Sequence, residues 1–270
     1  MRDFDYHRPA TLAEALDLLA GDDEALLLAG GQTLLPTMKQ GLSAPSALVD
    51  LHGIAGLDAI SVVGQVLSLG SMARHADVAG NALVRQAIPA LAGLAGGIGD
   101  PHIRNRGTIG GSIANNDPSA DYPAALLACG AEIQTDRRRL CADEFLAGLF
   151  TTALEPGEII LAVHFPIPRR FAYASIRNPA SRYAVAGVAV AQRQDSTVGV
   201  GVTGAGADGA FRWAEAEAAL QDGFHPATLD GLVVDPDLLL SDLRMPQDYR
   251  ARLVEVMTRR AVEAALRGTK

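Results

Sequence analysis

The sequence predicts an α+β fold with more than one lobe, and three observations lead to this prediction. Near the N-terminus, residues 25–40 run from an apolar segment through a glycine pair into a helical segment. Further on, Pro166 and Pro168 end a strong apolar strand and predict a lobe boundary near residues 167–171. Beyond that boundary, segments rich in small and β-branched residues precede two helical patterns, which is typical of a second α+β lobe with its own sheet. A chain of 270 residues is long enough for two or three such lobes.

The N-terminal elements follow from short local signals. Thr11 and Glu14 form a capping box ahead of apolar residues at helical spacing, which predicts a helix over residues 11–20. Gly64-Gln65 separates two strand-like runs and predicts a hairpin over residues 60–69. The other elements expected here are strands at 25–28 and 47–51, helical turns at 34–40, and a helix at 87–97 with Pro89 in its first turn.

The stretch from residue 99 to residue 123 is rich in turn-forming residues. It contains four glycines, three prolines and three asparagines, so we expect neither a core helix nor a central strand there. The glycines within residues 107–112 permit a positive φ and a close approach of the backbone to another group. Free amides beside the hydroxyls of Thr108 and Ser112 would form a nest for phosphate oxygens. An ordinary long surface loop is the alternative interpretation of this composition.

A second glycine pair, Gly30-Gly31, lies between the apolar and helical segments near the N-terminus. A strand, a glycine turn and a helix start point backbone amides at an anion, although a plain tight connection has the same pattern. Two such turns would hold the two phosphates of a pyrophosphate from either side, and Asp121 would bond a ribose hydroxyl. Because no acid–base constellation accompanies the turns, we expect a cofactor to supply the chemistry. A dinucleotide such as FAD, held without a Rossmann fold, fits this pattern.

The rest of the chain alternates between short helices and strands. The three arginines at 137–139 are interpreted as a solvated hairpin tip. Residues 199–204 match G-x-G-x-x-G, but valines alternate through the glycines, which predicts a strand interior and not a dinucleotide-binding turn. The expected elements are helices at 124–129, 143–148, 213–220 and 249–266, a hairpin from 131–135 to 140 onward, and strands at 159–165, 172–176, 183–192 and 198–203.

Composition and charge argue against several classes of protein. The formal net charge of −8 disfavours a nucleic-acid binder, which needs basic surface to neutralise phosphates. Cys129 and Cys141 have neither metal-ligand nor disulfide spacing, so we expect no metal and no iron–sulfur site in this chain. No apolar run approaches the roughly 18 residues of a membrane helix, and the N-terminus lacks the apolar region of a signal peptide. We expect a cytoplasmic protein, at most peripheral to a membrane through a complex.

Five segments of the chain carry a family resemblance: AGGQTLLPTMKQ (29–40), IRNRGTIGGSIANNDPSADYPAALLACGA (103–131), GEIILAVHFPIP (157–168), RNPASRYAVAGVAV (177–190) and VTGAGADGAFRWAEAEAAL (202–220). They resemble FAD-binding medium subunits of molybdenum hydroxylases, of the aerobic carbon monoxide dehydrogenase and xanthine dehydrogenase types. The pair of AGGxT and TIGGS motifs is far more specific than either motif alone. The resemblance implies a two-subdomain FAD-binding fold of the vanillyl-alcohol-oxidase type at residues 1–55 and 56–168, followed by a small α+β domain at 169–270.

The resemblance also implies which residues bind FAD. The AGGxT and TIGGS turns would hold the pyrophosphate, Asn115 would lie along the cofactor, and Asp121 would reach its adenosine side. Leu161 and Arg177 would approach the flavin, and Tyr183 would stand over its ring, although Leu161 and Tyr183 also suit plain packing. No residue is assigned a catalytic role, and we expect non-covalent FAD. The full set is Ala29, Gly30, Gly31, Gln32, Thr33, Leu34, Thr108, Ile109, Gly110, Gly111, Ser112, Asn115, Asp121, Leu161, Arg177 and Tyr183.

The implied function is electron transfer within a complex. The chain would accept electrons from an iron–sulfur small subunit and pass them through FAD to an external acceptor, while a molybdopterin-containing large subunit oxidises the substrate. A dimer of heterotrimers is expected, with carbon monoxide, aldehydes or N-heterocycles as substrates. Gln32-Thr33 replaces the common His-Ser, and Asn116 stands where the family has a small residue or histidine. The alternatives are a self-sufficient FAD oxidase or reductase, and a binding module that has lost FAD.

Overall fold

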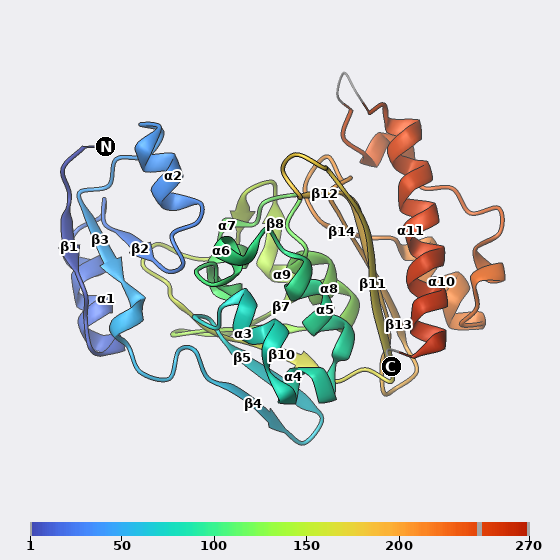
Figure 1. Cartoon of the computed structure of the whole chain (residues 1–270), viewed down its shortest axis with the longest axis horizontal. Helices are drawn as coiled ribbons and strands as arrows, with labels where there is room; N and C mark the ends of the chain where they lie inside the picture. The colour runs from blue at the N-terminus through green and yellow to red at the C-terminus, as the bar shows by residue number, and fades with distance from the viewer. Residues whose placement is uncertain (1, 242–244, 269–270) are drawn as a thin grey trace.

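The computed structural model describes residues 2–241 and 245–268. Three main sheets follow one another along the chain and from left to right in Figure 1. The first is a parallel sheet of order β1-β3-β2. Helices connect its strands, because parallel strands need a crossover connection. Its elements are β1 (Asp5–His7), α1 (Leu12–Gly21), β2 (Leu26–Leu28), α2 (Leu34–Lys39), β3 (Ala47–Asp50) and the short η1 turn (Leu51–Gly53).

The second sheet is antiparallel, of order β4-β5-β10-β6-β7, and helices cover it. The hairpin predicted at Gly64-Gln65 is confirmed, since Val63 pairs with Val66. Its strands are β4 (Ile60–Val63), β5 (Val66–Gly70), β6 (Glu132–Thr135), β7 (Arg139–Cys141) and β10 (Ile160–Pro166), with the small pair β8 (Leu146–Gly148) and β9 (Thr151–Thr152) beside it. Its helices are α3 (His75–Gly80), α4 (Ala82–Ala87), α5 (Pro89–Gly97), α6 (Pro101–Arg104), α7 (Ile109–Asn115), α8 (Tyr122–Cys129) and α9 (Ala142–Phe145).

Two sequence predictions in this region are wrong. The helix expected at 143–148 ends at Phe145, because the chain continues into β8 to pair with β9. The glycine-rich stretch does contain a core helix, α7, in which Ile109 and Ile113 are fully buried. These two isoleucines lie one helical turn apart, so they bury the same face of α7 even though glycines separate them.

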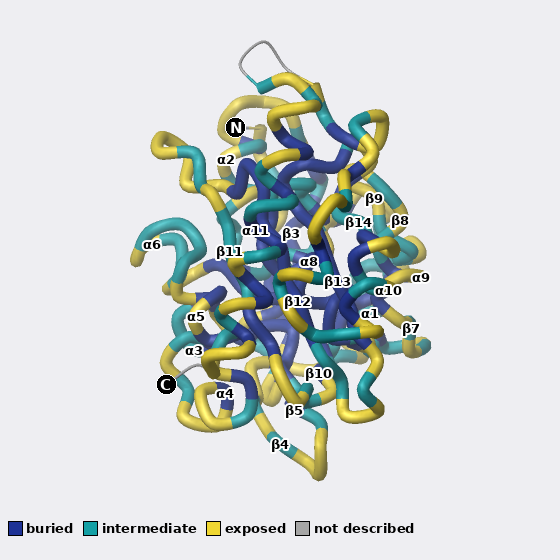
Figure 2. Tube along the Cα trace, turned by 90° about the vertical axis from the view of Figure 1, so that its right-hand side faces the viewer, coloured by how far each residue is buried: buried dark blue, intermediate teal, exposed yellow. Residues whose placement is uncertain are grey.

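The third sheet is antiparallel, of order β11-β12-β13-β14, and has a helical outer layer. The strand β12 is buried from residue 184 to residue 191, because α8 lies on one side of the sheet and α11 on the other. Figure 2 shows this buried layer along α8, β12 and β13. The elements are β11 (Arg170–Arg177), β12 (Ala184–Gln192), β13 (Val198–Thr203), β14 (Phe211–Arg212), α10 (Ala214–Asp222), η2 (Pro226–Leu229), η3 (Pro236–Leu238) and α11 (Gln247–Arg267).

Residues 199–203 of the G-x-G-x-x-G segment lie within β13, as the alternating valines predicted, and Gly204 follows the strand. A Cβ at Gly199 would lie 2.2 Å from the carbonyl oxygen of Ala128, and one at Gly201 would lie 2.2 Å from that of Ala124. The two carbonyls are one helical turn apart on α8. The glycines therefore allow α8 to pack directly on the backbone of β13.

The α+β class predicted from the sequence is confirmed, whereas the division at residues 55 and 168 stays a prediction. The first two sheets share a small apolar core, in which Leu57, Met72 and Ile159 from the second part pack with Ala15 and Val49 from the first. This core sets how the first sheet sits on the second, and therefore how the two glycine turns meet.

Candidate functional site

The two glycine turns that the sequence singled out are in contact. A Cβ at Gly30 would lie 2.3 Å from the carbonyl oxygen of Arg106 and 2.7 Å from the Cα of Gly107. A Cβ at Gly111 would lie 3.5 Å from that of Ala29. The residue type matters here because only a glycine at position 30 lets the two backbones approach this closely. The fold therefore brings residues 29–34 and 107–112 together.

The first turn supplies the hydrogen-bond donors. The backbone amides of residues 31–34 donate to no group in the described part of the chain. Thr33 precedes α2 without capping it through its side chain, and Gly31 has a φ of +69°, which glycine adopts freely. The Gln32 side-chain amide donates to the carbonyl of Gly30 at 3.1 Å. A turn with unpaired amides at the start of a helix is suited to bind an anion.

The second turn differs from the sequence prediction. The amide of Gly110 donates to the Ser71 carbonyl at 2.8 Å, that of Gly111 to Thr108 Oγ1 at 3.1 Å, and that of Ser112 to the Thr108 carbonyl at 3.0 Å. These three amides are not free, because Thr108 caps α7 and Ser71 approaches from β5.

The glycines of this turn also have a different role from the one expected. None of the glycines at 107, 110 and 111 has a positive φ; they are needed for close packing, as at Gly110, where a Cβ would lie 2.6 Å from the Ser71 oxygen. Thr108, Ile109 and Gly110 are buried, whereas Gly111 and Ser112 are half-buried. Only the last two face outward far enough to touch a ligand.

Leu161 is joined to the second turn through Ser71. The Ser71 amide donates to the Leu161 carbonyl at 2.9 Å, and the Ser71 carbonyl in turn accepts from Gly110. Leu161 is half-buried on β10 and packs against the core shared by the first two sheets. The structure therefore places this predicted residue beside the glycine turns.

A second group of predicted residues surrounds Asp121 at the start of α8. The Asp121 carboxylate accepts from the Tyr173 hydroxyl in a short hydrogen bond and from the Arg177 guanidinium at 3.0 Å. Burial raises the pKa of Asp121, and the charge of Arg177 opposes that rise. These two bonds go to Oδ1, and Arg177 also donates to Oδ2 at 3.3 Å, so both carboxylate oxygens have protein partners. The ribose contact expected for Asp121 stays a prediction. Tyr173, which sequence reasoning missed, lies on β11 with no motif to mark it.

Tyr183 borders this group from the loop between β11 and β12. Its side chain is exposed, and its backbone carbonyl accepts from the amide of Asn178. Partial burial, together with the charges of Asp117 and Asp121, raises the pKa of the Tyr183 hydroxyl. The Arg177 guanidinium donates to the carbonyl of Arg182 at 3.0 Å, and this contact places the neighbouring Tyr183 close to Arg177 and Asp121.

Asn115 and Asn116 end α7. Asn115 is half-buried and stays in the predicted set. Asn116, which the sequence marked only as a departure from the family, is buried and left-handed at φ 42°. Its side-chain amide donates to the carbonyls of Gly148 and Thr151, at 2.8 Å each. Asparagine is one of the few residues that tolerate this backbone conformation, which is the signal that could have found it.

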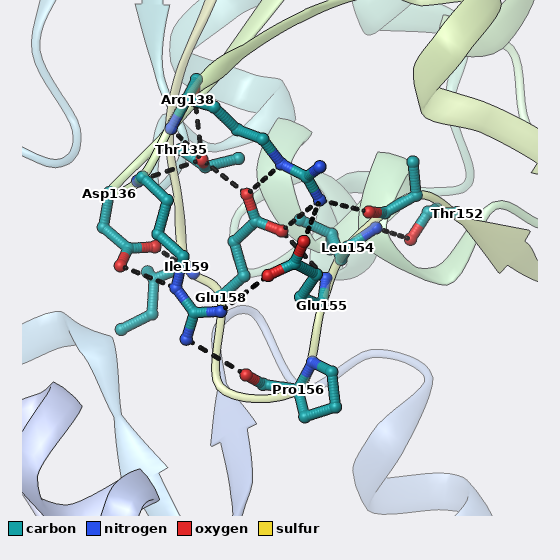
Figure 3. A network of polar contacts seen from close by, with 11 residues as sticks. Thr135, Asp136, Arg138, Thr152, Leu154, Glu155, Pro156, Glu158 and Ile159 are labelled. Atoms are coloured by element: carbon teal, nitrogen blue, oxygen red, sulfur yellow. Dashed lines mark hydrogen bonds and ion pairs between the residues drawn. The ribbon is translucent and has the colours of Figure 1, made fainter.

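The three arginines lie at the hairpin between β6 and β7, and Arg137 and Arg139 are exposed as expected, whereas Arg138 is half-buried against Glu158. Arg138 donates twice to the Glu158 carboxylate, at 3.0 and 2.9 Å, and Thr135 Oγ1 donates to it at 2.7 Å (Figure 3). The Glu158 side chain has no exposed surface. The hydrogen bonds from Arg138 lower the pKa of Glu158 to about 2. This network fixes the segment that leads into β10 and Leu161.

A surface hollow of about 560 Å³ lies elsewhere, between β1 and α1. None of the predicted binding residues lines it. Its shape is open and its lining is mixed in charge, so the contacting glycine turns remain the better candidate for a cofactor site. The lining residues are Tyr6, His7, Arg8, Pro9, Glu14, Asp17 and Leu18.

Comparison with known proteins decides the family. A family model described as "FAD binding domain in molybdopterin dehydrogenase" matches residues 2–168. The chain belongs to this family. Among its relatives, the carbon monoxide dehydrogenase medium chain of Afipia carboxidovorans is 35% identical, covering 97% of this chain and 96% of that one. The nicotine 6-hydroxylase medium subunit of Paenarthrobacter nicotinovorans is 33% identical, covering 96% of both chains.

Solved structures agree with this family of FAD-binding domains. A carbon monoxide dehydrogenase chain from Hydrogenophaga pseudoflava superposes with a TM-score of 0.88 at 32% identity, covering 98% of both chains. A quinoline 2-oxidoreductase chain from Pseudomonas putida 86 superposes with a TM-score of 0.86 at 28% identity, covering 99% of this chain and 98% of that one. Membership of the family makes FAD the cofactor of this chain, and the chain is a flavoprotein subunit of an oxidoreductase.

Proposed function

We propose that the contacting glycine turns hold the pyrophosphate of FAD. The observation that carries this proposal is that residues 31–34 present unpaired amides in the turn whose Ala29 contacts the second turn, where a Cβ at Gly111 would lie 3.5 Å from that of Ala29. Two phosphates need several donors and a backbone that comes close to them, and this junction offers both. FAD supplies the redox chemistry when bound, and the chain binds and orients it.

Because Asp121 and Arg177 are ion-paired, they would act on the same end of the cofactor; we assign both to the flavin end, in place of the adenosine contact that the resemblance implied for Asp121. Asp121 holds the Arg177 guanidinium in place, and Tyr183 presents an exposed aromatic ring beside it. A cation held by a buried carboxylate keeps its position without side-chain rearrangement, which suits it to a fixed contact with the polar edge of the flavin. Leu161 would approach the flavin from β10.

We further propose that the chain transfers electrons within a molybdenum hydroxylase, as one subunit of a dimer of heterotrimers. It would take electrons from an iron–sulfur small subunit and pass them through FAD to an external acceptor, while a molybdopterin-containing large subunit oxidises the substrate. The support is full-length similarity to medium subunits. The relatives' names include carbon monoxide, nicotine and quinoline, so the substrate follows the partner rather than this chain, and carbon monoxide is one candidate. No helix in the described residues has the length and apolar character to cross a bilayer.

The pyrophosphate assignment is tested with Gly111→Val. The valine side chain would occupy the space between Thr108 and Ala29, so we expect the purified protein to lose its flavin absorbance while its circular dichroism spectrum is unchanged. Arg139→Ala is the control, because Arg139 is an exposed hairpin residue away from both turns and should keep the flavin. Wild-type FAD content in Gly111→Val would overturn the assignment.

The electron-transfer role is tested by affinity capture from the native host, with an absorption spectrum of the captured material. Flavin bands together with iron–sulfur absorbance, a large partner and a small partner are the expected result. A flavoprotein that elutes alone and oxidises its own small substrate would instead support the self-sufficient oxidase or reductase.

A further inference from the structure

Tyr173 is a partner of Asp121 that no sequence motif marks. It lies on β11, four residues before Arg177, and both side chains donate to Oδ1 of the buried Asp121 carboxylate. Loss of water around the Tyr173 hydroxyl, together with the Asp121 charge, raises the pKa of Tyr173 well above its usual value. The hydroxyl therefore stays protonated at neutral pH and acts as the donor.

Gly187 leaves room for this hydroxyl on the neighbouring strand. Residues 184–191 of β12 are all buried, and apart from Gly187 they are alanine or valine. A Cβ at Gly187 would lie 2.2 Å from Tyr173 Oη and 3.0 Å from the Thr203 methyl carbon. Gly187 has no positive φ, so the space and not the backbone conformation requires a glycine here. The strand lacks a side chain at the point where the Tyr173 hydroxyl lies.

The backbone that carries Asp121 is fixed by β13. Thr203 Oγ1 donates to the carbonyls of Pro118 and Ala120, at 2.9 and 2.7 Å. The amide of Gly204 donates to the same Pro118 carbonyl at 2.8 Å. Because three hydrogen bonds hold the residues just before it, Asp121 has little freedom to move toward a new partner if one of its own is removed.

Arg177 is held as firmly as its carboxylate partner. Its guanidinium donates to both oxygens of Asp121, at 3.0 and 3.3 Å, and to the carbonyl of Arg182 at 3.0 Å. A Cβ at Gly97 would lie 2.9 Å from the same guanidinium. The side chain is nevertheless 24% exposed. A fixed cation with an accessible part can act on a neighbouring ligand without first rearranging.

The charge of this cluster depends on how much negative charge Asp121 retains. Arg177 and Tyr173 both stabilise the ionised Asp121 carboxylate, in opposition to its burial. The charges of Asp121 and Asp117 also reach the hydroxyl of Tyr183 and raise its pKa. Asp121 cancels part of the positive charge of Arg177, and a hydrogen bond donated to Asp121 reduces that cancellation.

We propose that Tyr173 is a positioning residue that raises the reduction potential of the bound flavin by acting through Asp121 and Arg177. The inference rests on the proposed function, which assigns this group to the flavin end of the cofactor. The hydroxyl withdraws negative charge from Asp121, so more of the Arg177 charge acts on the flavin. A less negative site favours the reduced flavin, because reduction adds electrons to the ring system.

The test is a spectroelectrochemical titration of the protein as purified from its host, with the subunits that accompany it, followed through the flavin absorption bands. In Tyr173→Phe the reduction equilibrium should shift about tenfold toward the oxidised flavin, which lowers the potential by about 30 mV for a two-electron couple. Tyr122→Phe is the matched control. Tyr122 is a buried neighbour of Asp121 whose hydroxyl has no hydrogen-bond partner in the described part of the chain, so its loss should leave the potential unchanged.

Gly187→Ala tests the same hydroxyl from the neighbouring strand. The added methyl group would displace Tyr173 Oη from Asp121, so the potential should again fall. Once Tyr173→Phe has removed the hydroxyl, adding Gly187→Ala should cause no further fall. A double variant whose shift equals the sum of the two single shifts would contradict a route through the hydroxyl. Thermal unfolding of each variant separates a loss of stability from the change in potential.

An unchanged or higher potential in a Tyr173→Phe protein that keeps its flavin would overturn the proposal and leave FAD binding intact. An equal shift in Tyr122→Phe would also overturn it, because the effect would then not depend on the bond to Asp121. The same holds for a folded Tyr173→Phe protein that loses its flavin, since the hydroxyl would then serve binding. A wild-type protein without flavin would refute the proposed function itself.

Discussion

Gly30→Ala is the substitution that best tests whether contact between the two glycine turns creates the cofactor site. The added Cβ would lie 2.3 Å from the Arg106 oxygen, whereas ordinary contacts begin at 3.4 Å, so the turns must separate by about 1 Å. Gly30 lacks a positive φ, so the backbone itself tolerates alanine. Overpacking of this size costs about 1–3 kcal/mol, which corresponds to roughly 5- to 150-fold in the Kd for FAD if the strain falls on the bound state.

The assay is titration of the flavin-free protein with FAD, followed by quenching of flavin fluorescence, with a thermal unfolding curve of each variant. Gly21→Ala is the matched control, because a Cβ there would meet nothing within 4 Å and should leave the Kd unchanged. Wild-type affinity in a folded Gly30→Ala protein would refute the reasoning, since FAD would then bind without the close approach of the turns.

Two further predictions concern stability. Because Arg138 lowers the pKa of Glu158 from 4.5 to about 2, the ionised Glu158 contributes on the order of 3 kcal/mol above pH 4.5, and that contribution disappears as the pH falls toward 2. Glu158→Gln should therefore be less stable than wild type in urea at pH 7, with a smaller difference at pH 3; an equal difference at both would contradict the assignment. Gly201→Ala should lower the free energy of unfolding by about 1–3 kcal/mol, because its Cβ would lie 2.2 Å from the Ala124 oxygen on α8. Gly93→Ala, at an open helical position, should instead be neutral or stabilising, and thermal unfolding compares the two.

Elements with local signals could be predicted from the sequence. Thr11 caps α1 by accepting from the Glu14 amide, and Glu14 accepts in turn from the amide of Ala10. The turn at Gly64-Gln65 is equally local. The errors arose where a distant segment decides the outcome. The helix at 143–148 is cut short by pairing of β8 with β9, and α7 forms a core helix because neighbouring elements bury its isoleucines.

The candidate site shows the same division. The two glycine pairs were recognisable because their residue types are unusual, but the free amides could not be assigned from composition. The Gly110 amide donates to the carbonyl of Ser71, a residue that follows β5 and is far from Gly110 along the chain. The pairing of Arg138 could not be predicted either, because its partner Glu158 lies across the sheet, in the loop that precedes β10. A run of charged residues in the sequence does not indicate which buried residue the fold will place beside it.

The sequence by itself determined the α+β class, the hairpins and capped helices, and the two glycine turns, because propensity, capping and turn geometry act within a few residues. Only the tertiary structure decided that Gly30 meets Gly107, that Asp121 pairs with Tyr173 and Arg177, and that Asn116 holds the turn between β8 and β9. These contacts join residues that are far apart along the chain. Their free energies depend on distance, burial and available partners, and those quantities exist only once the sheets have packed.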